Sequence, residues 1–321
     1  MKATHGRAAG PRGHVPEDPR IADFAARIVL EDNHSPRTAQ EYARDIEGFA
    51  RFLAPDRPLA EASATVAVVD GAAIRRYVLE LRERRRAKAS SVRRKLFALR
   101  RYFAFERREG RRVDNPALDV KPPKAEERLP HVLAAPQVAR LLRTRIAGRR
   151  DELRLRDVAI LELLYASGIR RAELVGLDLA EVDLERRIAR VIGKGNKERA
   201  VLFNAAARDA IRAYLAIRPR SADPALFLSA RRRRLSHNQA GKTFRLYADL
   251  CGLDVRATPH TLRHSFATHL VQNGADLVTV KELLGHRSLA TTQIYTNVSL
   301  EHMRRTYDEA HPRDAEAERG S

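Results

Sequence analysis

The stretch at residues 115–130 limits most strongly how this chain can fold. It holds four prolines and shows no apolar periodicity. Proline fixes φ and lacks a backbone N–H, so such a stretch interrupts both helices and sheets. At 321 residues the chain is long enough to form two cores. We therefore expect two domains separated by an extended linker.

Before the linker, apolar residues recur at helical spacing. One helix is expected to begin at Pro36 with Ser35 as its N-cap, and another is expected to be capped by Ser90 or Ser91. A further helix is expected from Asp70 to about residue 85. These patterns predict a small, entirely helical first domain.

After the linker, short alternating stretches join the helical pattern. Residues 181–184, 188–192 and 199–202 predict strands, and the turn at 193–196 is rich in glycine. The chain is therefore predicted to be mainly α with a small β-sheet. The helices expected here cover 135–145, 154–167, 205–217, 238–250 and segments from 260 to the C-terminus. The expected domain boundaries are 1–17 for a disordered basic arm, 18–112 for the first domain, 113–130 for the linker, 131–312 for the second domain and 313–321 for a flexible tail.

The charge balance points to an anionic partner. The chain has 61 Lys and Arg against 41 Asp and Glu, a formal net charge of +20. A solvated basic surface is the simpler alternative, but so many positive charges would repel one another without a polyanion, so we expect nucleic acid.

The helix expected after Ser91 carries many of these basic residues, and few of them have an acidic residue four positions away in the sequence that could pair with them. The residues expected to contact the DNA backbone are Arg93, Arg94, Lys95, Arg100 and Arg101.

The cysteine content and the apolar runs indicate the compartment. The single cysteine, Cys251, excludes an internal disulfide and a cysteine-rich metal site. No apolar run approaches the roughly 20 residues of a membrane span, and the N-terminus lacks the apolar core of a signal peptide. The sequence favours a cytoplasmic protein.

Residues 259–264 combine histidines with an arginine. His260 and His264, four apart on a helix, match the spacing of metal ligands. Arg263 would place a positive charge beside the cation, and there is no glutamate base between the histidines. We therefore predict no metal. His260 and Arg263 instead form a pair that could grip a phosphate, whereas His264 and His269 are expected to be structural.

Other candidates are weak one by one. Arg170 and Glu173 lie three apart, so a helix would place them on one face as an ion pair. Lys194 could be an ordinary turn residue, and Tyr295 an ordinary core tyrosine. Together, on a basic chain, they predict phosphodiester chemistry in which the Tyr295 phenol is the nucleophile.

Four motifs occur in register along the second domain: residues 168–173, 193–199, 260–264 and 284–295. In order and spacing they resemble the tyrosine recombinases, the phage integrase family, and within it the bacterial Xer subgroup. The ending at 307–313 is closer to XerC than to XerD. The resemblance implies a helical SAM-like core-binding domain followed by a catalytic domain with a three-stranded antiparallel sheet.

The resemblance also implies a role for each matching position. Two arginines would clamp the scissile phosphate, a lysine would protonate the leaving 5′-oxygen, and histidines would contact the phosphate and handle the nucleophile's proton. A tyrosine would form a 3′-phosphotyrosyl bond, supported by one acidic residue. The corresponding positions are Arg170 and Arg263, Lys194, His260 and His286, Tyr295, and Glu173. The reaction exchanges one ester for another, so neither metal, ATP nor another cofactor is expected.

The Xer role implied by the resemblance is resolution of chromosome dimers. The implied partners are a specific double-stranded DNA site, a XerD-like recombinase in a cyclic heterotetramer, and a DNA translocase of the division machinery. A short helix at about 300–310 would dock into the neighbouring protomer, the alternative being its own domain. Rival interpretations are a XerD-type or mobile-element integrase, a type IB topoisomerase, and a basic architectural DNA-binding protein that is not an enzyme.

Overall fold

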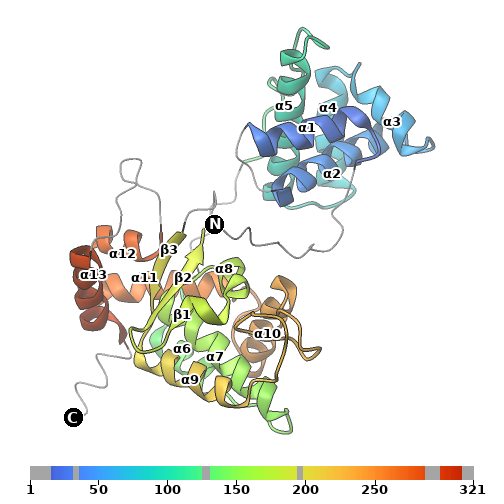
Figure 1. The fold of residues 1–321 in the computed structure, drawn as a ribbon. Helices are drawn as coiled ribbons and strands as arrows, with labels where there is room; N and C mark the ends of the chain where they lie inside the picture. The colour runs from blue at the N-terminus through green and yellow to red at the C-terminus, as the bar shows by residue number, and fades with distance from the viewer. Residues whose placement is uncertain (1–15, 32–35, 125–130, 194–197, 286–296, 313–321) are drawn as a thin grey trace, which may run out of the picture. The chain divides into compact units, whose positions relative to one another are not determined.

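The computed structural model describes residues 16–31, 36–124, 131–193, 198–285 and 297–312. The chain divides into two compact units, Met1–Arg128 and Leu129–Ser321. Each unit has a hydrophobic core of its own. Figure 1 shows the helices and strands of both units. The predicted basic arm and C-terminal tail fall almost entirely outside the described residues.

The first unit is helical in its described part. Its core is formed by aromatic and aliphatic side chains, among them Phe24, Ile46, Phe49, Tyr77 and Phe103, all almost fully buried. Helix α2 is central, because it packs against α1, α3, α4 and α5 (Figure 1). The helices are α1 (Pro19–Leu30), α2 (Pro36–Leu53), α3 (Leu59–Val66), α4 (Gly71–Glu83) and α5 (Ala89–Arg108).

Side-chain caps explain where two of these helices begin. The Asp18 carboxylate accepts hydrogen bonds from two backbone N–H groups of the first turn of α1, at 2.7 and 3.2 Å. Asp70 accepts one from Ala73 N at 2.8 Å and so starts α4 where the sequence predicts. Helix α2 begins at Pro36 as predicted, while its expected cap Ser35 lies outside the described residues.

The start of α5 differs from the prediction. The helix begins at Ala89, one residue before the expected cap, and Lys88 occupies the N-cap position without a side-chain hydrogen bond. Ser90 and Ser91 therefore lie inside the first turn and do not cap it. Serine favours caps, but with the apolar face that begins at Val92 packed into the core, the helix starts two or three residues earlier than a serine cap would place it.

The second unit combines helices with a three-stranded antiparallel sheet in the order β1-β2-β3. Val182 pairs with Ala189, and Ala189 pairs with Val201. This confirms the predicted fold class. The strands are β1 (Val182–Asp183), β2 (Ile188–Ile192) and β3 (Glu198–Leu202). The helices are α6 (Ala135–Arg143), α7 (Asp151–Ser167), α8 (Arg171–Gly176), α9 (Ala205–Ile217), α10 (His237–Leu250), α11 (Pro259–Gln272), α12 (Leu277–Leu283) and α13 (Asn297–Ala310).

Helix α7 forms the centre of this unit and packs against α9 and α11. It is buried on all sides over its last two-thirds. It ends at Gly168, whose φ is +56°. A Cβ at this position would lie 2.5 Å from the Phe266 ring. Glycine is thus required both by the backbone conformation and by the close approach of α11, and it turns the chain toward Arg170.

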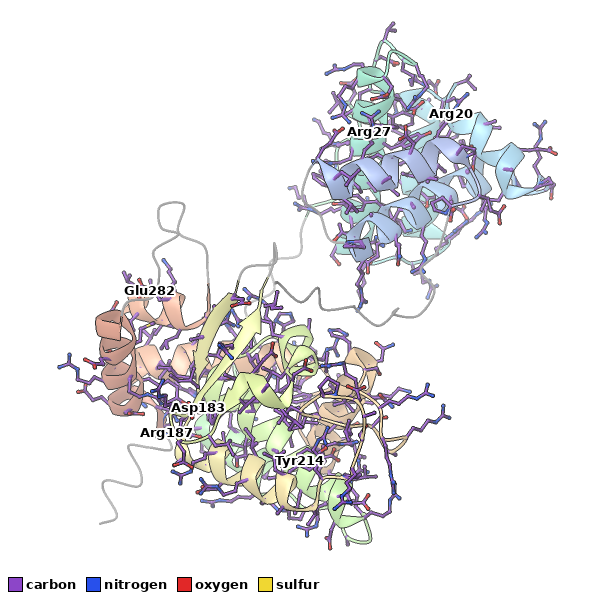
Figure 2. The ribbon with its side chains drawn as sticks, in the orientation of Figure 1. Arg20, Arg27, Asp183, Arg187, Tyr214 and Glu282 are labelled. Carbon is purple, nitrogen blue, oxygen red and sulfur yellow. The ribbon has the colours of Figure 1, made fainter. Side chains whose placement is uncertain are left out.

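Helix α13 packs against α11 and α12 of its own unit. Met303 and Tyr307 are buried in the unit's core, and the Tyr307 hydroxyl donates to the Ala166 carbonyl at 2.6 Å. Arg187, at the turn between β1 and β2 (Figure 2), forms an ion pair with Asp308 at 3.3 Å. In the single chain α13 thus packs against its own unit, which is the alternative that the sequence left open, and docking into a neighbouring protomer stays a prediction.

Cys251 is buried at the end of α10, with Sγ 2.8 Å from the Thr144 hydroxyl. None of the helices in the described ranges is both long and apolar enough to span a membrane. Across those same ranges, no three His, Cys, Asp or Glu side chains gather as metal ligands.

Candidate active site

Arg170 and Glu173 form the predicted ion pair. Arg170 is the N-cap residue of α8, and its Nη1 donates to Glu173 Oε1 at 2.9 Å. The backbone N–H of Arg170 donates to the other carboxylate oxygen, also at 2.9 Å. The carboxylate therefore fixes both the backbone and the guanidinium of Arg170. About a third of the Arg170 side chain stays exposed, so it can still reach a ligand.

Glu173 has a second cationic partner that the sequence did not suggest. Arg199 on β3 donates from Nη2 to Glu173 Oε2 at 2.9 Å. Both side chains are at least nine-tenths buried. Burial alone would raise the pKa of Glu173, but the charge of Arg199 and the hydrogen bonds from Arg170 hold it below its usual range. The carboxylate therefore stays ionised and keeps both arginines in place.

Arg199 ends the motif at residues 193–199, and the resemblance implies no role for it. A signal was present, however. Arg199 lies two residues before Val201 on β3, so strand alternation places both on the buried face of the sheet. An arginine on a buried strand face needs a partner, because an unpaired buried charge is costly.

Arg263 lies on the buried face of α11. Its guanidinium donates to the Gly168 carbonyl and, at 2.6 Å, to the Leu284 carbonyl. These bonds occupy two of its five N–H donors. Burial first, and then the charges of Arg170 and Arg199, lower the pKa of Arg263 to about 10. Three guanidinium groups near one carboxylate leave the site with an excess of positive charge, which suits an anion.

His260 lies in the first turn of α11, which is capped by Thr258 and begins with Pro259. Partial burial, followed by the charges of Arg263, Arg171 and Arg170, lowers the pKa of His260 below its ordinary value of 6.5. The imidazole is therefore neutral at pH 7. A neutral ring can both donate and accept a hydrogen bond, and the N-terminus of the helix adds further positive potential.

The chain at the end of α12 is hydrogen-bonded to Arg199 and Arg263. Arg199 Nη1 donates to the Leu283 carbonyl at 3.0 Å, next to the Leu284 carbonyl that Arg263 holds. Gly285 follows with φ +64°, and a Cβ there would lie 2.6 Å from Arg199 Cδ. From Gly285 the sequence continues directly to His286.

Three of the predicted site residues, Lys194, His286 and Tyr295, lie outside the described residues. The structure brings together Arg170, Glu173 and Arg263, with His260 close enough for these cations to lower its pKa.

The other two histidines of this region lie apart from the arginines. His264 is exposed on α11. His269 is buried, and its Nδ1 is 2.9 Å from the Tyr165 hydroxyl. Burial lowers the pKa of His269. A buried, neutral and hydrogen-bonded imidazole fits the structural role predicted for His269.

The basic helix α5 is more engaged within its own unit than its sequence suggested. Arg94 forms an ion pair with Asp45 on α2, and Lys95 Nζ lies 2.7 Å from the same carboxylate. Arg100 donates to backbone carbonyls beyond the helix, including Val120 O at 2.9 Å. The expectation that these residues lack partners is wrong, because the partners are distant in sequence. Arg93, in contrast, is exposed.

Arg101 is half-buried, and its positive charge acts on Tyr42 of α2. It too is thus part of the interior of the helical unit rather than a wholly solvated side chain. Of the five basic residues predicted to contact DNA, Arg93 and Arg94 are classed as exposed.

Comparison with known proteins gives consistent matches along the chain. Residues 131–302 match the model of the phage integrase family, and residues 21–110 match that of the phage integrase N-terminal SAM-like domain. The chain is 41% identical over 297 residues to "Tyrosine recombinase XerC" of Alcanivorax borkumensis, covering 91% of this chain and 94% of the relative. It is 41% identical over 303 residues to the protein of the same name in Myxococcus xanthus, covering 92% and 98%.

Solved structures show the same fold at lower identity. The integrase of transposon Tn1549, bound to transposon right end DNA, matches with a TM-score of 0.65 and 19% identity, covering 94% of this chain and 98% of that one. A lambda integrase dimer bound to a core site matches with a TM-score of 0.62 and 18% identity, covering 86% and 97%.

Proposed function

Because this chain belongs to the phage integrase family and is a DNA strand-exchanging tyrosine recombinase, we propose that it recombines a specific DNA site through a phosphotyrosyl intermediate. The observation that carries the proposal is the arginine cluster. Glu173 orients Arg170 and Arg199, and Arg263 on α11 is held by its hydrogen bond to the Leu284 carbonyl. Such a cluster is built to receive an anion with a fixed position.

Arg170 and Arg263 bind the scissile phosphate in this proposal. Guanidinium groups match the geometry of phosphate oxygens, and their charge is worth more in a partly buried site. As the phosphorus becomes five-coordinate, negative charge grows on its equatorial oxygens, and arginines already in position stabilise it without reorganising. The neutral His260 donates a further hydrogen bond to the phosphate.

Tyr295 supplies the nucleophile. Its phenolic oxygen attacks phosphorus, a 3′-phosphotyrosyl bond forms, and the bond to the 5′-oxygen of the next nucleotide breaks. His286 accepts the phenolic proton, and Lys194 donates a proton to the leaving 5′-oxygen. The 5′-hydroxyl of a second strand then reverses these steps, which joins the strands in a new combination.

The two units divide the work in this proposal. The helical domain predicted at 18–112 binds DNA, and the domain at 131–312 binds and cleaves it. The first residues of the predicted linker 113–130 extend the helical unit, because Ala117 and Val120 are buried in its core. Of the five α5 residues predicted to contact DNA, Arg93 and Arg94 are the exposed ones.

The names of the curated relatives support a biological role. Relatives at 41% identity over nine-tenths of the chain carry the name XerC. We accordingly assign to this protein the resolution of chromosome dimers in the cytoplasm. Its partner would be a XerD-like recombinase, in a cyclic heterotetramer on the recombination site, with a division-associated DNA translocase acting on the complex.

The test is a nicked suicide substrate, which traps the covalent complex on a denaturing gel. The wild-type chain should form the adduct, and Tyr295→Phe should bind the site with unchanged affinity and form none. An adduct with the phenylalanine variant would reassign the nucleophile. Relaxation of supercoiled DNA without strand exchange would indicate a topoisomerase, and DNA binding without any adduct would indicate an architectural protein.

A further inference from the structure

The chain between α9 and α10 forms a tight hairpin at residues 228–234, called here the arginine hairpin. Leu228 pairs with Arg234, and Ser229 N donates to the Arg233 carbonyl at 2.8 Å. Arg232 N donates back to the Ser229 carbonyl at 2.9 Å, and Arg232 has φ +57°. A hairpin of this kind normally places glycine at the left-handed position. Here the position is taken by an arginine.

Three consecutive arginines, 231 to 233, are exposed at the tip. Within the described part of the chain, none of the three forms an ion pair. Arg232 lies over the start of α7, where it lines a small pocket with Arg150 and Glu152. Arg231 and Arg233 thus present two positive charges that no described carboxylate of the unit pairs with. Like charges held side by side repel each other unless an anion lies between them.

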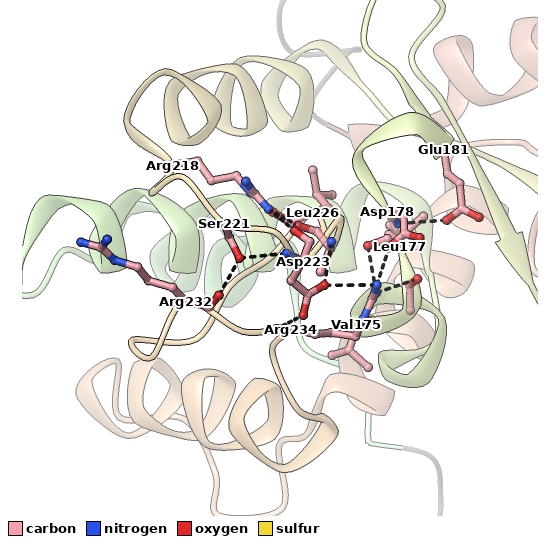
Figure 3. A network of polar contacts seen from close by, with 12 residues as sticks. Val175, Leu177, Asp178, Glu181, Arg218, Ser221, Asp223, Leu226, Arg232 and Arg234 are labelled. Atoms are coloured by element: carbon pink, nitrogen blue, oxygen red, sulfur yellow. Dashed lines mark hydrogen bonds and ion pairs between the residues drawn. The ribbon is translucent and has the colours of Figure 1, made fainter. Parts of the chain in front are cut away.

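Arg234 fastens the hairpin to the end of α8 (Figure 3). Its Nη1 lies 3.1, 3.0 and 3.3 Å from the carbonyl oxygens of Val175, Gly176 and Leu177. Its Nη2 forms an ion pair with Asp178. Arg234 therefore caps the C-terminal end of α8 in the way that cations near a helix C-terminus do.

The other side of the hairpin is equally constrained. Arg218 Nη2 donates to the Ala225 carbonyl at 2.6 Å and to the Asp223 carbonyl at 3.2 Å. The Ser221 hydroxyl donates to the Arg232 carbonyl at 2.7 Å, and Arg234 N donates to the Asp223 carboxylate at 2.7 Å (Figure 3). The side chain of Arg232 extends away from this network. The backbone of the tip is thus held by hydrogen bonds while its three arginine side chains are exposed.

A second link joins α10 to the start of α8. Arg171 Nε lies 3.0 Å from His237 Nε2, in the first turn of α10. The Arg171 guanidinium also covers Gly241, where a Cβ would lie 2.1 Å from Nη1. Helix α8 is thus tied at its C-terminal end to the arginine hairpin and at its N-terminal end to α10, the helix that follows the hairpin. Its six residues span about 9 Å at 1.5 Å per residue, and Arg170 immediately precedes it.

From this geometry we propose that the arginine hairpin is a second phosphate-binding site, which sets the register of the DNA relative to Arg170. Arg231 and Arg233 bind backbone phosphates of a duplex a few base pairs from the scissile one. Arg234 transmits that position through the short, rigid α8. The proposal rests on the proposed function, since it requires that Arg170 bind the scissile phosphate.

The first experiment measures the affinity for duplex DNA against salt concentration. Each phosphate contact contributes roughly 0.9 to the slope of log K against log salt, so Arg231→Gln/Arg233→Gln should reduce the slope by about 1.8. The control, Arg143→Gln/Arg305→Gln, removes the same charge from two other exposed positions of the unit and should leave the slope unchanged. If both double variants change the salt slope equally, the hairpin arginines contribute only through the net charge of the protein, and the proposal is overturned.

The second experiment distinguishes phosphate binding by the hairpin from its effect on the position of the DNA relative to Arg170. Arg234→Met keeps both tip charges but releases α8, so the salt slope should stay unchanged. Covalent complex formation at saturating DNA should slow by about tenfold or more, because misplacement by about 1 Å can cost ~100-fold in rate. Arg234→Lys, which can still cap the helix, should recover part of the rate. An Arg234→Met enzyme with wild-type cleavage would show that the hairpin does not set the register.

Two controls keep the outcomes distinct. If Arg234→Met lowers the melting temperature, Asp178→Asn provides a milder release, and the same slowing is expected from it. If the wild-type chain binds DNA but forms no covalent complex, the proposed function fails, whereas the phosphate site is still judged by the salt slopes alone.

Discussion

At position 173 a single buried carboxylate accepts hydrogen bonds from two arginines on different elements. Arg170 belongs to the start of α8 and Arg199 to β3, so Glu173 joins a helix to a sheet at the site. An ion pair this deeply buried is costly to break, because the remaining charges lose their partner without regaining water.

Glu173→Gln should therefore destabilise the second unit at pH 7, by about 3–5 kcal/mol. The pKa of Glu173 is lowered in the folded state, so its stabilisation is complete above its ordinary value of 4.5 and is lost as the pH falls through the folded pKa. The stability difference between wild type and Glu173→Gln should thus shrink toward acid pH. Chemical unfolding at a series of pH values measures it.

Asp209 provides the control, because its pKa is also lowered but its ion pair with Arg208 is largely exposed. Asp209→Asn should change stability by no more than about 1 kcal/mol. A Glu173→Gln effect that is as small, or that is constant with pH, would contradict the role assigned to the buried carboxylate.

The two partners of Glu173 also show what could be predicted from the sequence. Arg170 lies three residues away, so helical spacing alone predicts the pair. Arg199 is 26 residues away, and its approach depends on how the sheet packs against α8. The same limit explains Asp45, whose ion pairs with Arg94 and Lys95 join two helices. Spacing rules predict partners within an element, but not across elements.

On helix α5, the arginines fall into two classes with different consequences. Arg93→Gln should leave the melting temperature unchanged and reduce the salt slope of DNA binding by about 0.9, since Arg93 is exposed. Arg100→Gln should lower the melting temperature, because its bonds to the carbonyls of Ala117 and Val120 are lost. If Arg93→Gln leaves the salt slope unchanged, Arg93 faces solvent and does not contact a DNA phosphate.

Helix α13 gives a second prediction for an element. Truncation after Asn297 removes Met303 and Tyr307 from the core and deletes the hydrogen bond to Ala166. Loss of one large buried side chain typically costs 2–5 kcal/mol, so thermal unfolding of the second unit should shift markedly downward. Truncation after Pro312 should have no such effect. A stable Asn297 truncation that fails only in cooperative DNA binding would show that the helix docks into a neighbour instead.

The elements themselves were predictable to different extents. Helix α9 starts and ends where the sequence predicts, because the Asn204 side chain caps it and its apolar spacing is regular. Helix α3 was missed, since eight residues give little more than two turns of pattern. The boundary of α5 was missed because packing, rather than a serine cap, decides where it begins.

The whole molecule has two cores rather than one. Residues 1–128 and 129–321 should therefore fold as separate fragments, each being large enough to bury a core. Calorimetry of each fragment should reproduce one transition of the full chain. A fragment that is unfolded alone, or a full chain with a single transition shared by both units, would show that the cores depend on each other.

The buried thiol of Cys251 has a practical consequence for following the enzyme on its substrate. It is the chain's only cysteine and is 7% exposed. A maleimide dye should therefore react slowly with the native protein and rapidly with a cysteine introduced on the surface. Cysteines introduced at exposed positions, such as Asp56 in the first unit and Arg305 in the second, could each receive a fluorophore while Cys251 is kept. Energy transfer between the two dyes would then report whether the distance between these positions changes during the reaction.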